Sequence, residues 1–265
     1  MKKITTLLAI ALIFELSCSV VPLTGRKQLN LVSDAEVNQS AAQSYSQLLS
    51  DPKTTVINTG ADPRRIKTIG SKLSTAVEGY LTANGYGADY KFQWEFNLIK
   101  SDEVNAWCMP GGKVAVYSGI LPIAQTDAGL ATVMAHEIGH AIARHSAERI
   151  SQQMAVQNVG SAVSAATNNK PQTTQLVISQ LYGVGGQLML LKYSRDQESE
   201  ADHLGLIFMA MAGYDPNNAL AFWKRMEAQN KGGSPPEFLS THPADATRIT
   251  DIQNRLPEAL KYYKH

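Results

Sequence analysis

The amino-acid sequence predicts an α+β fold that is mainly α-helical, with a small β-sheet. Apolar residues recur at helical spacing between positions 62 and 83 and again between 127 and 150, as on helices with a buried face. Residues 90–99 alternate apolar with polar side chains, which is the period of a β-strand. Of the 265 residues, 44% are hydrophobic, enough for one sizeable core.

Cap and turn residues mark the first two helices. Ser33 or Asp34 can cap a helix that runs to about Leu49. Pro63 lies in the first turn of the next helix, a position that proline favours. That helix ends at the turn residues Asn84-Gly85-Tyr86-Gly87. We therefore expect two helices before the strand at 90–99.

The second half of the chain is predicted to be mostly helical. The turn Pro110-Gly111-Gly112 introduces a second strand over Lys113–Tyr117. Residues 155–187 are rich in small and polar side chains, and we interpret them as helices joined by a loop, with no assigned role. Further helices are predicted at 127–150, 188–212, 217–229 and from Pro243 or Ala244 towards Tyr263.

The helix at 127–150 carries the pattern His136-Glu137-Ile138-Gly139-His140. Side chains four positions apart lie on one helix face, so both imidazoles can reach one metal ion. Glu137 lies one step round the helix, close enough to take a proton from water on that metal. The alternative is a pair of core histidines with other partners, but burying these polar groups unpaired is costly. The motif therefore favours a zinc hydrolase.

A third metal ligand is expected because a catalytic zinc site uses three protein ligands and one open position. Glu198 and Asp202 share a helix face, so Glu198 can reach the metal while Asp202 binds the free nitrogen of a ligand histidine. Glu200 is the competing ligand, but it lies roughly 200° round the helix from Glu198. The alternative is a solvated acidic stretch. On a continuous helix His145 turns away from His140. We therefore expect His145 to be either a surface residue or an outer neighbour of the site.

Residues 1–17 are predicted to be a signal peptide. A basic start precedes a short apolar stretch, Ile4–Phe14, which is too short to span a bilayer permanently. Leu16-Ser17-Cys18-Ser19 resembles a bacterial lipobox, although Glu15 stands where an aliphatic residue is usual. We expect lipid on Cys18, the alternative being an ordinary secretory signal. Residues 18–33 are then a lipidated, extended tether, and residues 34–265 form a single domain.

The remaining composition excludes several classes. If Cys18 carries lipid, Cys108 has no partner within the chain, so no disulfide framework is implied. Cys108 is expected to be a small buried thiol rather than a zinc ligand or a nucleophile. The net charge is +1 and no dense basic run is present, so nothing indicates nucleic-acid binding.

The metal-binding pattern and a later Arg195-x-x-Glu198-x-x-Ala201-Asp202 resemble the gluzincin family of membrane-associated metallopeptidases. That family includes the CAAX prenyl endopeptidase, HtpX, the mitochondrial OMA-type protease, BepA and LoiP. The chain lacks the transmembrane helices of the first two branches and is most similar to the soluble periplasmic lipoproteins. Three further segments match the family: Pro22–Leu29, Asn105–Gly112, and Ser240-Thr241-His242-Pro243 with Arg248.

The resemblance implies a zincin-like helical core with the sheet beside the metal helix, and one zinc ion per chain. It implies His136, His140 and Glu198 as ligands, with Asp202 behind them and Glu137 as the general base. Substrate binding is assigned by similarity to Asn105, Ala106, Gly111 and Gly112. His242 and Arg195 are our candidates for stabilising the oxyanion, and His242 is alternatively a fourth zinc ligand in a resting state. The segment up to and including Lys113–Tyr117 is expected to be an edge strand for extended substrates.

These features predict a zinc-dependent endopeptidase of the bacterial cell envelope that degrades misfolded or misassembled envelope proteins. We expect export to the periplasm, a lipid anchor in the outer membrane, and polypeptides and envelope proteins as partners. The alternative function is a zinc-stabilised, non-catalytic chaperone or scaffold lipoprotein. Glu137 favours the enzyme, because zinc binding alone does not need it. A serine esterase lacks its Gly-x-Ser-x-Gly motif.

Overall fold

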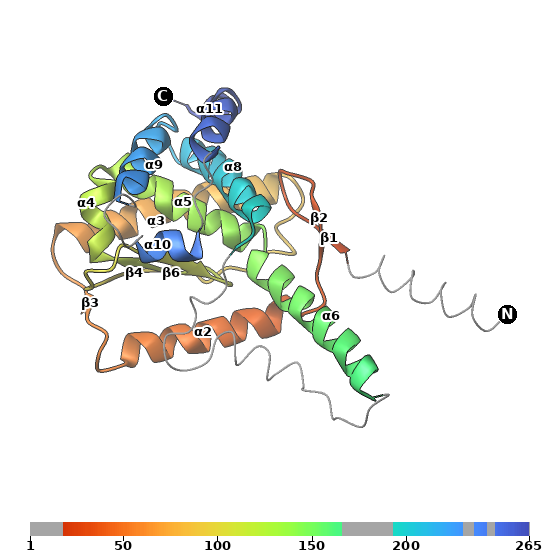
Figure 1. Cartoon of the computed structure of the whole chain (residues 1–265). Coiled ribbons are helices and arrows are strands. Elements are labelled where there is room, and N and C mark those ends of the chain that lie inside the picture. The colour runs from red at the N-terminus through yellow and green to blue at the C-terminus, as the bar shows by residue number, and fades with distance from the viewer. Residues whose placement is uncertain (1–17, 166–192, 230–235, 243–246, 265) are drawn as a thin grey trace.

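The computed structural model describes residues 18–165, 193–229, 236–242 and 247–264. Helices dominate this part of the chain, which confirms the mainly α-helical α+β class (Figure 1). The predictions for residues 1–17, and most of those for 155–187, lie outside the described residues. Two 3₁₀ turns, η1 (Ser118–Ile120) and η4 (Leu260–Tyr262), accompany the longer elements. The helices are α2 (Asp34–Ser50), α3 (Ala61–Ala83), α4 (Leu121–Ala124), α5 (Asp127–Ile142), α6 (His145–Ala165), α8 (Arg195–Met211), α9 (Asn218–Gln229), α10 (Glu237–Thr241) and α11 (Arg248–Ala259).

The centre of the fold is the pair of helices α5 and α8. Thr126 begins α5 as an N-cap, because its side-chain oxygen accepts a hydrogen bond from the Gly129 amide. Ser194 begins α8 with a capping box, in which Gln197 bonds back to the cap residue. Nearly every α5 side chain from Leu130 to His140 is buried, as is most of α8. The polar residues within these buried stretches therefore face protein, not solvent, whereas those in the first turns, such as Arg195, are exposed.

Two glycines let α5 and α8 approach closely. A Cβ atom added at Gly139 would lie 2.9 Å from the carbonyl oxygen of Ala201, and one at Gly205 would lie 3.0 Å from the amide nitrogen of His136. Both obstacles are backbone atoms, which cannot rotate away. The two helices therefore pack backbone to backbone at the level of the metal-binding pattern.

A four-stranded sheet lies between α2 on one side and α3 and α5 on the other (Figure 1). Its strand order is β3-β4-β6-β5, with β4 and β6 parallel and the other pairs antiparallel. The prediction of an edge strand up to and including Lys113–Tyr117 holds only for the part before Lys113, because β6 pairs with both β4 and β5. The strand at the edge is β5, and it lies beside α5. The strands are β1 (Cys18–Val20), β2 (Lys27–Leu29), β3 (Val56–Ile57), β4 (Glu95–Ile99), β5 (Ala106–Met109) and β6 (Lys113–Tyr117).

The predicted strand at residues 90–99 is shorter than expected, since only Glu95–Ile99 forms β4. The aromatic residues before it pack as a row of rings, with Phe92 and Trp94 stacked at a centroid distance of 4.4 Å. One ladder-like hydrogen bond persists here, from the Gln93 amide to the Gly111 carbonyl at 2.9 Å. The alternating pattern therefore identified a packed aromatic face as well as a strand.

Residues 18–29 form an antiparallel hairpin of β1 and β2 that packs on the domain. Val21 is fully buried in the main core, and Arg26 makes ion pairs with Glu148 and Glu200. The prediction of an extended tether over residues 18–33 missed this pairing. The physical reason is that its partners lie more than a hundred residues away, beyond the reach of local sequence patterns.

The helix predicted over 127–150 is interrupted. α5 ends at Ile142, and Arg144 adopts a left-handed conformation with φ 52° before α6 begins at His145. Arg144 is held there by an ion pair with Asp34 at 2.5 Å and by stacking over the Tyr90 ring at 4.1 Å. The break changes the direction of the chain, so the helical spacing used for His145 does not apply.

The other predicted helices are found with shifted ends, α8 beginning at Arg195 and the last helix at Arg248. The short helix α10 was not predicted. Within the described parts of the chain, no helix combines the length and apolar character needed to cross a membrane.

We predict that Gly205→Ala destabilises the protein by about 1–3 kcal/mol, because the added methyl group meets the α5 backbone. Gly79→Ala is the matched control: Gly79 is also helical, on the exposed face of α3, and has nothing within 4 Å of an added Cβ. The control should gain about 0.5–1 kcal/mol from helix propensity alone. Urea unfolding measures both variants, and an equally stabilised Gly205→Ala contradicts the close packing.

Candidate metal centre

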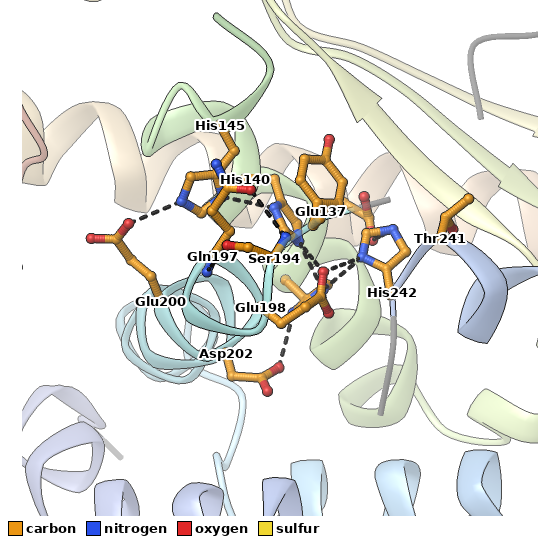
Figure 2. A network of polar contacts seen from close by, with 12 residues as sticks. Glu137, His140, His145, Ser194, Gln197, Glu198, Glu200, Asp202, Thr241 and His242 are labelled. Atoms are coloured by element: carbon orange, nitrogen blue, oxygen red, sulfur yellow. Dashed lines mark hydrogen bonds and ion pairs between the residues drawn. The ribbon is translucent and has the colours of Figure 1, made fainter. Parts of the chain in front are cut away.

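Four buried side chains from three segments converge on one point beneath the surface. α5 contributes His136 and His140, α8 contributes Glu198, and the residue after α10 contributes His242. Figure 2 shows His140, Glu198 and His242 turned towards one another. Each offers one ligand atom, and all four atoms lie within 4.8 Å of one another. The Nε2 atoms of His136 and His140 are 3.1 Å apart, and Glu198 Oε1 is 3.3 Å from the second of them.

This cluster fits a zinc ion. Two imidazoles and one carboxylate are the ligands of a known class of catalytic zinc site. The Glu198 Oε2 atom is buried with Arg248 Nη1 at 3.2 Å, but it makes no hydrogen bond within the described part of the chain, so it can still act as a metal ligand. Burial lowers the pKa of His140 well below its usual value, which keeps the ring neutral as a metal ligand must be.

Glu198 is ionised in this cluster. Burial alone would raise its pKa, but the charge of His242 and hydrogen bonds from the surrounding histidines lower it well below the usual value. Glu200 points away towards His145, so of the two candidate ligands it is Glu198 that joins the cluster, as the helical geometry predicted.

Asp202 lies behind His136, as predicted. Its Oδ1 atom is 2.9 Å from His136 Nδ1 and accepts a hydrogen bond from Arg248 Nη2 at 2.7 Å. Because Nδ1 is occupied in this way, Nε2 of His136 is the nitrogen that faces the cluster. Arg248 itself stacks over Trp223 at 3.3 Å from the ring centroid. The sequence identified Arg248 only as part of a matching segment, not as the support of Asp202.

Arg195, one of the two predicted oxyanion donors, is exposed in the first turn of α8. It lines a surface pocket together with Glu198 and Arg248. The arginine buried at the metal ligands is Arg248, whose Nη1 is 3.2 Å from Glu198 Oε2. The predicted Arg195 lies three positions before Glu198 in sequence, whereas the arginine that contacts the Glu198 carboxylate comes from α11.

Glu137 lies beside the cluster and is fully buried. Burial raises its pKa to about 7, and the nearby Glu198 charge adds to this, while His242, Arg248 and a hydrogen bond with the Cys108 backbone oppose it. Its Oε1 atom is 3.5 Å from His242 Nε2 and makes no hydrogen bond within the described residues. A carboxylate with a pKa near neutrality can both accept and return a proton.

His242 faces the ligands from the opposite side to α5. Its Nδ1 is 2.9 Å from Glu198 Oε1 and 3.3 Å from His136 Nε2, and its ring stacks on Phe238. The Phe238 amide donates to the carbonyl of Val104, just before β5, which fixes α10 beside the edge strand. The predicted role of His242 at the metal is therefore compatible with its position.

The four residues assigned to substrate binding lie along the β5–β6 hairpin. Asn105 and Ala106 are buried at the start of β5. Gly111 and Gly112 form the turn with φ of 79° and 87°, values that favour glycine. Gly111 also lines a cavity that reaches His140. Cys108, on the same strand, is a buried free thiol, as predicted.

His145 does not turn away from His140 as the spacing of a continuous helix predicted, and of the two expected positions, at the surface or as an outer neighbour of the site, it takes the second. His145 is fully buried, and its Nδ1 lies 2.8 Å from His140 Nδ1 (Figure 2). The left-handed conformation of Arg144 changes the chain direction after α5, so the His145 side chain points back to His140. Helical spacing cannot predict this change. The ring of Tyr193 covers His140 from another side at a centroid distance of 3.9 Å.

Two histidines and a glutamate from a second helix place this site among zinc metallopeptidases whose third ligand is a glutamate. The chain belongs to Peptidase family M48, whose family model matches residues 70–256 and whose members use zinc. Mitochondrial metalloendopeptidase OMA1 of Schizosaccharomyces pombe is 35% identical over 240 residues, covering 90% of this chain and 66% of the relative.

Two further relatives are similar over a shorter part. OMA1 of Saccharomyces cerevisiae is 35% identical over 179 residues, 65% of this chain and 50% of the relative. The β-barrel assembly-enhancing protease of Escherichia coli K12 is 31% identical over 172 residues, 62% of this chain and 35% of the relative. The chain thus spans from about a third to about two thirds of the length of these curated relatives.

We predict that Glu198→Gln weakens zinc binding by at least about tenfold, because a neutral amide replaces the anionic ligand. Glu137→Gln is the matched control: the same substitution at a buried glutamate on the facing helix should leave zinc affinity near that of the parent. Competition with a chelating dye measures both. Parental zinc affinity in Glu198→Gln contradicts its assignment as a ligand.

Proposed function

We propose that this chain is a zinc-dependent endopeptidase. The observation that supports this most is Glu137, a buried carboxylate with a pKa of about 7 and an unpartnered Oε1, held beside the ligand cluster. A purely structural zinc site has no use for such a group, since structural sites are closed by their ligands.

The chemistry divides between the metal and the chain. Bound zinc lowers the pKa of water and polarises a peptide carbonyl. Glu137 accepts a proton from the attacking water at its carboxylate and passes it to the leaving amine nitrogen. Asp202 and Arg248 hold His136 in place throughout. Of the two proposed oxyanion donors, His242 lies at the cluster, whereas Arg195 is exposed.

We propose that the edge strand β5 binds the substrate backbone. A sheet edge can accept an extended peptide as a further strand. β5 is an edge strand of the sheet, and it lies beside α5. The Cys108 backbone of this strand bonds to Glu137, so a peptide paired with β5 lies next to the base. Folded proteins rarely offer an extended strand with free backbone groups, so this mode favours unfolded or misassembled polypeptides.

The biological setting is a further proposal: export by residues 1–17, lipid on Cys18, and quality control at the bacterial outer membrane from the periplasmic side. Its support is the lipobox-like Leu16–Ser19 and a relative named for β-barrel assembly enhancement. The relatives named OMA1 are mitochondrial, so the family occupies more than one compartment. The alternative remains a non-catalytic chaperone or scaffold lipoprotein.

We predict that Glu137→Gln retains zinc but loses about 10²–10⁴-fold in casein cleavage, because the general base is removed. Zinc content by mass spectrometry and release of labelled casein fragments measure the two effects. Zinc-loaded Glu137→Gln that cleaves at the parental rate refutes the proposed base. If the parent does not cleave but suppresses casein aggregation as well as the variant does, the chaperone function holds instead.

We also propose that His242 would take the fourth ligand position of a bound zinc ion, because its Nδ1 lies 2.9 Å from Glu198 Oε1 and 3.3 Å from His136 Nε2. His242→Ala should then weaken zinc binding while opening the position to substrate, which raises turnover of zinc-saturated enzyme. Zinc titration and initial rates at saturating zinc separate the two roles. Unchanged zinc affinity with a rate lowered about 10²–10³-fold identifies an oxyanion donor instead.

A further inference from the structure

The ligand His140 is linked to a chain of buried polar groups that the proposed chemistry does not use. His140 Nδ1 lies 2.8 Å from His145 Nδ1, and His145 Nε2 lies 2.9 Å from Glu200 Oε2 (Figure 2). One set of tautomers satisfies every contact. His140 donates from Nδ1, His145 accepts at Nδ1 and donates from Nε2, and Glu200 accepts. This assignment leaves the Nε2 lone pair of His140 directed at the metal position.

The carboxylate at the end of this chain is fixed by the N-terminal hairpin. Arg26 Nε donates to Glu200 Oε2 at 2.7 Å, and Thr24 Oγ1 donates to Glu200 Oε1 at 2.5 Å. With His145, these two donors give Glu200 a hydrogen-bond partner at each of its oxygens: Arg26 and His145 at Oε2, and Thr24 at Oε1. Glu200 is thus oriented by residues 22–26 as much as by its own helix.

The same guanidinium also neutralises a second buried carboxylate. Arg26 Nη1 and Nη2 donate to the two oxygens of Glu148 at 2.7 and 3.0 Å, and Gln197 Nε2 donates to Glu148 at 2.9 Å. Glu148 and Glu200 are only 6% and 7% exposed. Without Arg26 these two charges face each other with little solvent, and their present positions are no longer favourable.

We propose that Arg26 is a positioning residue of the metal centre, which acts through Glu200 and His145 to hold the ring of ligand His140. The arrangement parallels the one behind His136, where Asp202 is held by Arg248 of α11. Behind each ligand histidine there is therefore a carboxylate, reached directly from His136 and through His145 from His140. Each carboxylate is held by an arginine that belongs to neither α5 nor α8. The hairpin of residues 18–29 is then part of the metal centre rather than only a connection to it.

The Arg26→Gln variant of the full-length protein tests this proposal. The variant is prepared without zinc, and its zinc Kd and the visible spectrum of added Co²⁺ are then measured. Arg65→Gln is the matched control: Arg65 also bridges two carboxylates, Asp62 and Asp127, its side chain is 31% exposed against 33% for Arg26, and it contacts the opposite end of α5. Arg26→Gln should raise the zinc Kd about 10–100-fold and change the Co²⁺ bands. Arg65→Gln should stay within about twofold.

A double-mutant cycle shows whether the effect travels through His145. Added to His145→Leu, Arg26→Gln should weaken zinc binding little further, because the link is already cut. The proposal is overturned if the two substitutions together raise the zinc Kd by the product of their separate effects. It is also overturned if Arg26→Gln has the zinc affinity and Co²⁺ spectrum of the parent. If Arg26→Gln does not fold, Thr24→Val removes the other donor to Glu200 and should raise the zinc Kd in the same direction. No rise in that variant overturns the proposal as well.

Discussion

Backbone contact between α5 and α8 is the constraint on which the metal centre depends. Gly139 of α5 faces Ala201 of α8, and Gly205 of α8 faces His136 of α5, so the two backbones touch beside the clustered side chains. At this separation Glu198 comes within 3.3 Å of His140 and Asp202 within 2.9 Å of His136. Larger residues at either glycine would separate ligands that belong to different helices, and a zinc site tolerates little error in distance.

The two ends of the described chain close the site around this helix pair. The β1–β2 hairpin brings Arg26 to Glu148 and Glu200, while α11 brings Arg248 to Glu198 and Asp202. Buried carboxylates are costly unless they are paired, and here each is paired by a cation from a distant segment. The edge strand β5 completes the site with a backbone contact to Glu137. Residues from both ends of the described chain therefore contact the buried carboxylates around the site.

Local periodicity was sufficient to predict the parts of the site that lie within single helices. His136 and His140 share a face of α5, and the roughly 200° separation between Glu198 and Glu200 agrees with the presence of Glu198, and not Glu200, in the cluster. The errors arose where the backbone leaves a regular helix or where pairing is distant. His145 returns to His140 only because Arg144 is left-handed, and the hairpin and β5 depend on partners that no local pattern identifies. The supporting arginines were missed for the same reason, since each comes from an element remote in sequence.

A crystal structure of the zinc-loaded protein, with the ion located by its anomalous signal, tests the central claim most directly. The account predicts one ion bound to Nε2 of His136, Nε2 of His140 and a carboxylate oxygen of Glu198, at about 2.0–2.2 Å. It also predicts that Nδ1 of the two histidines still faces Asp202 and His145. An ion bound to Glu200 or Cys108, or bound by only one of the two helices, contradicts it.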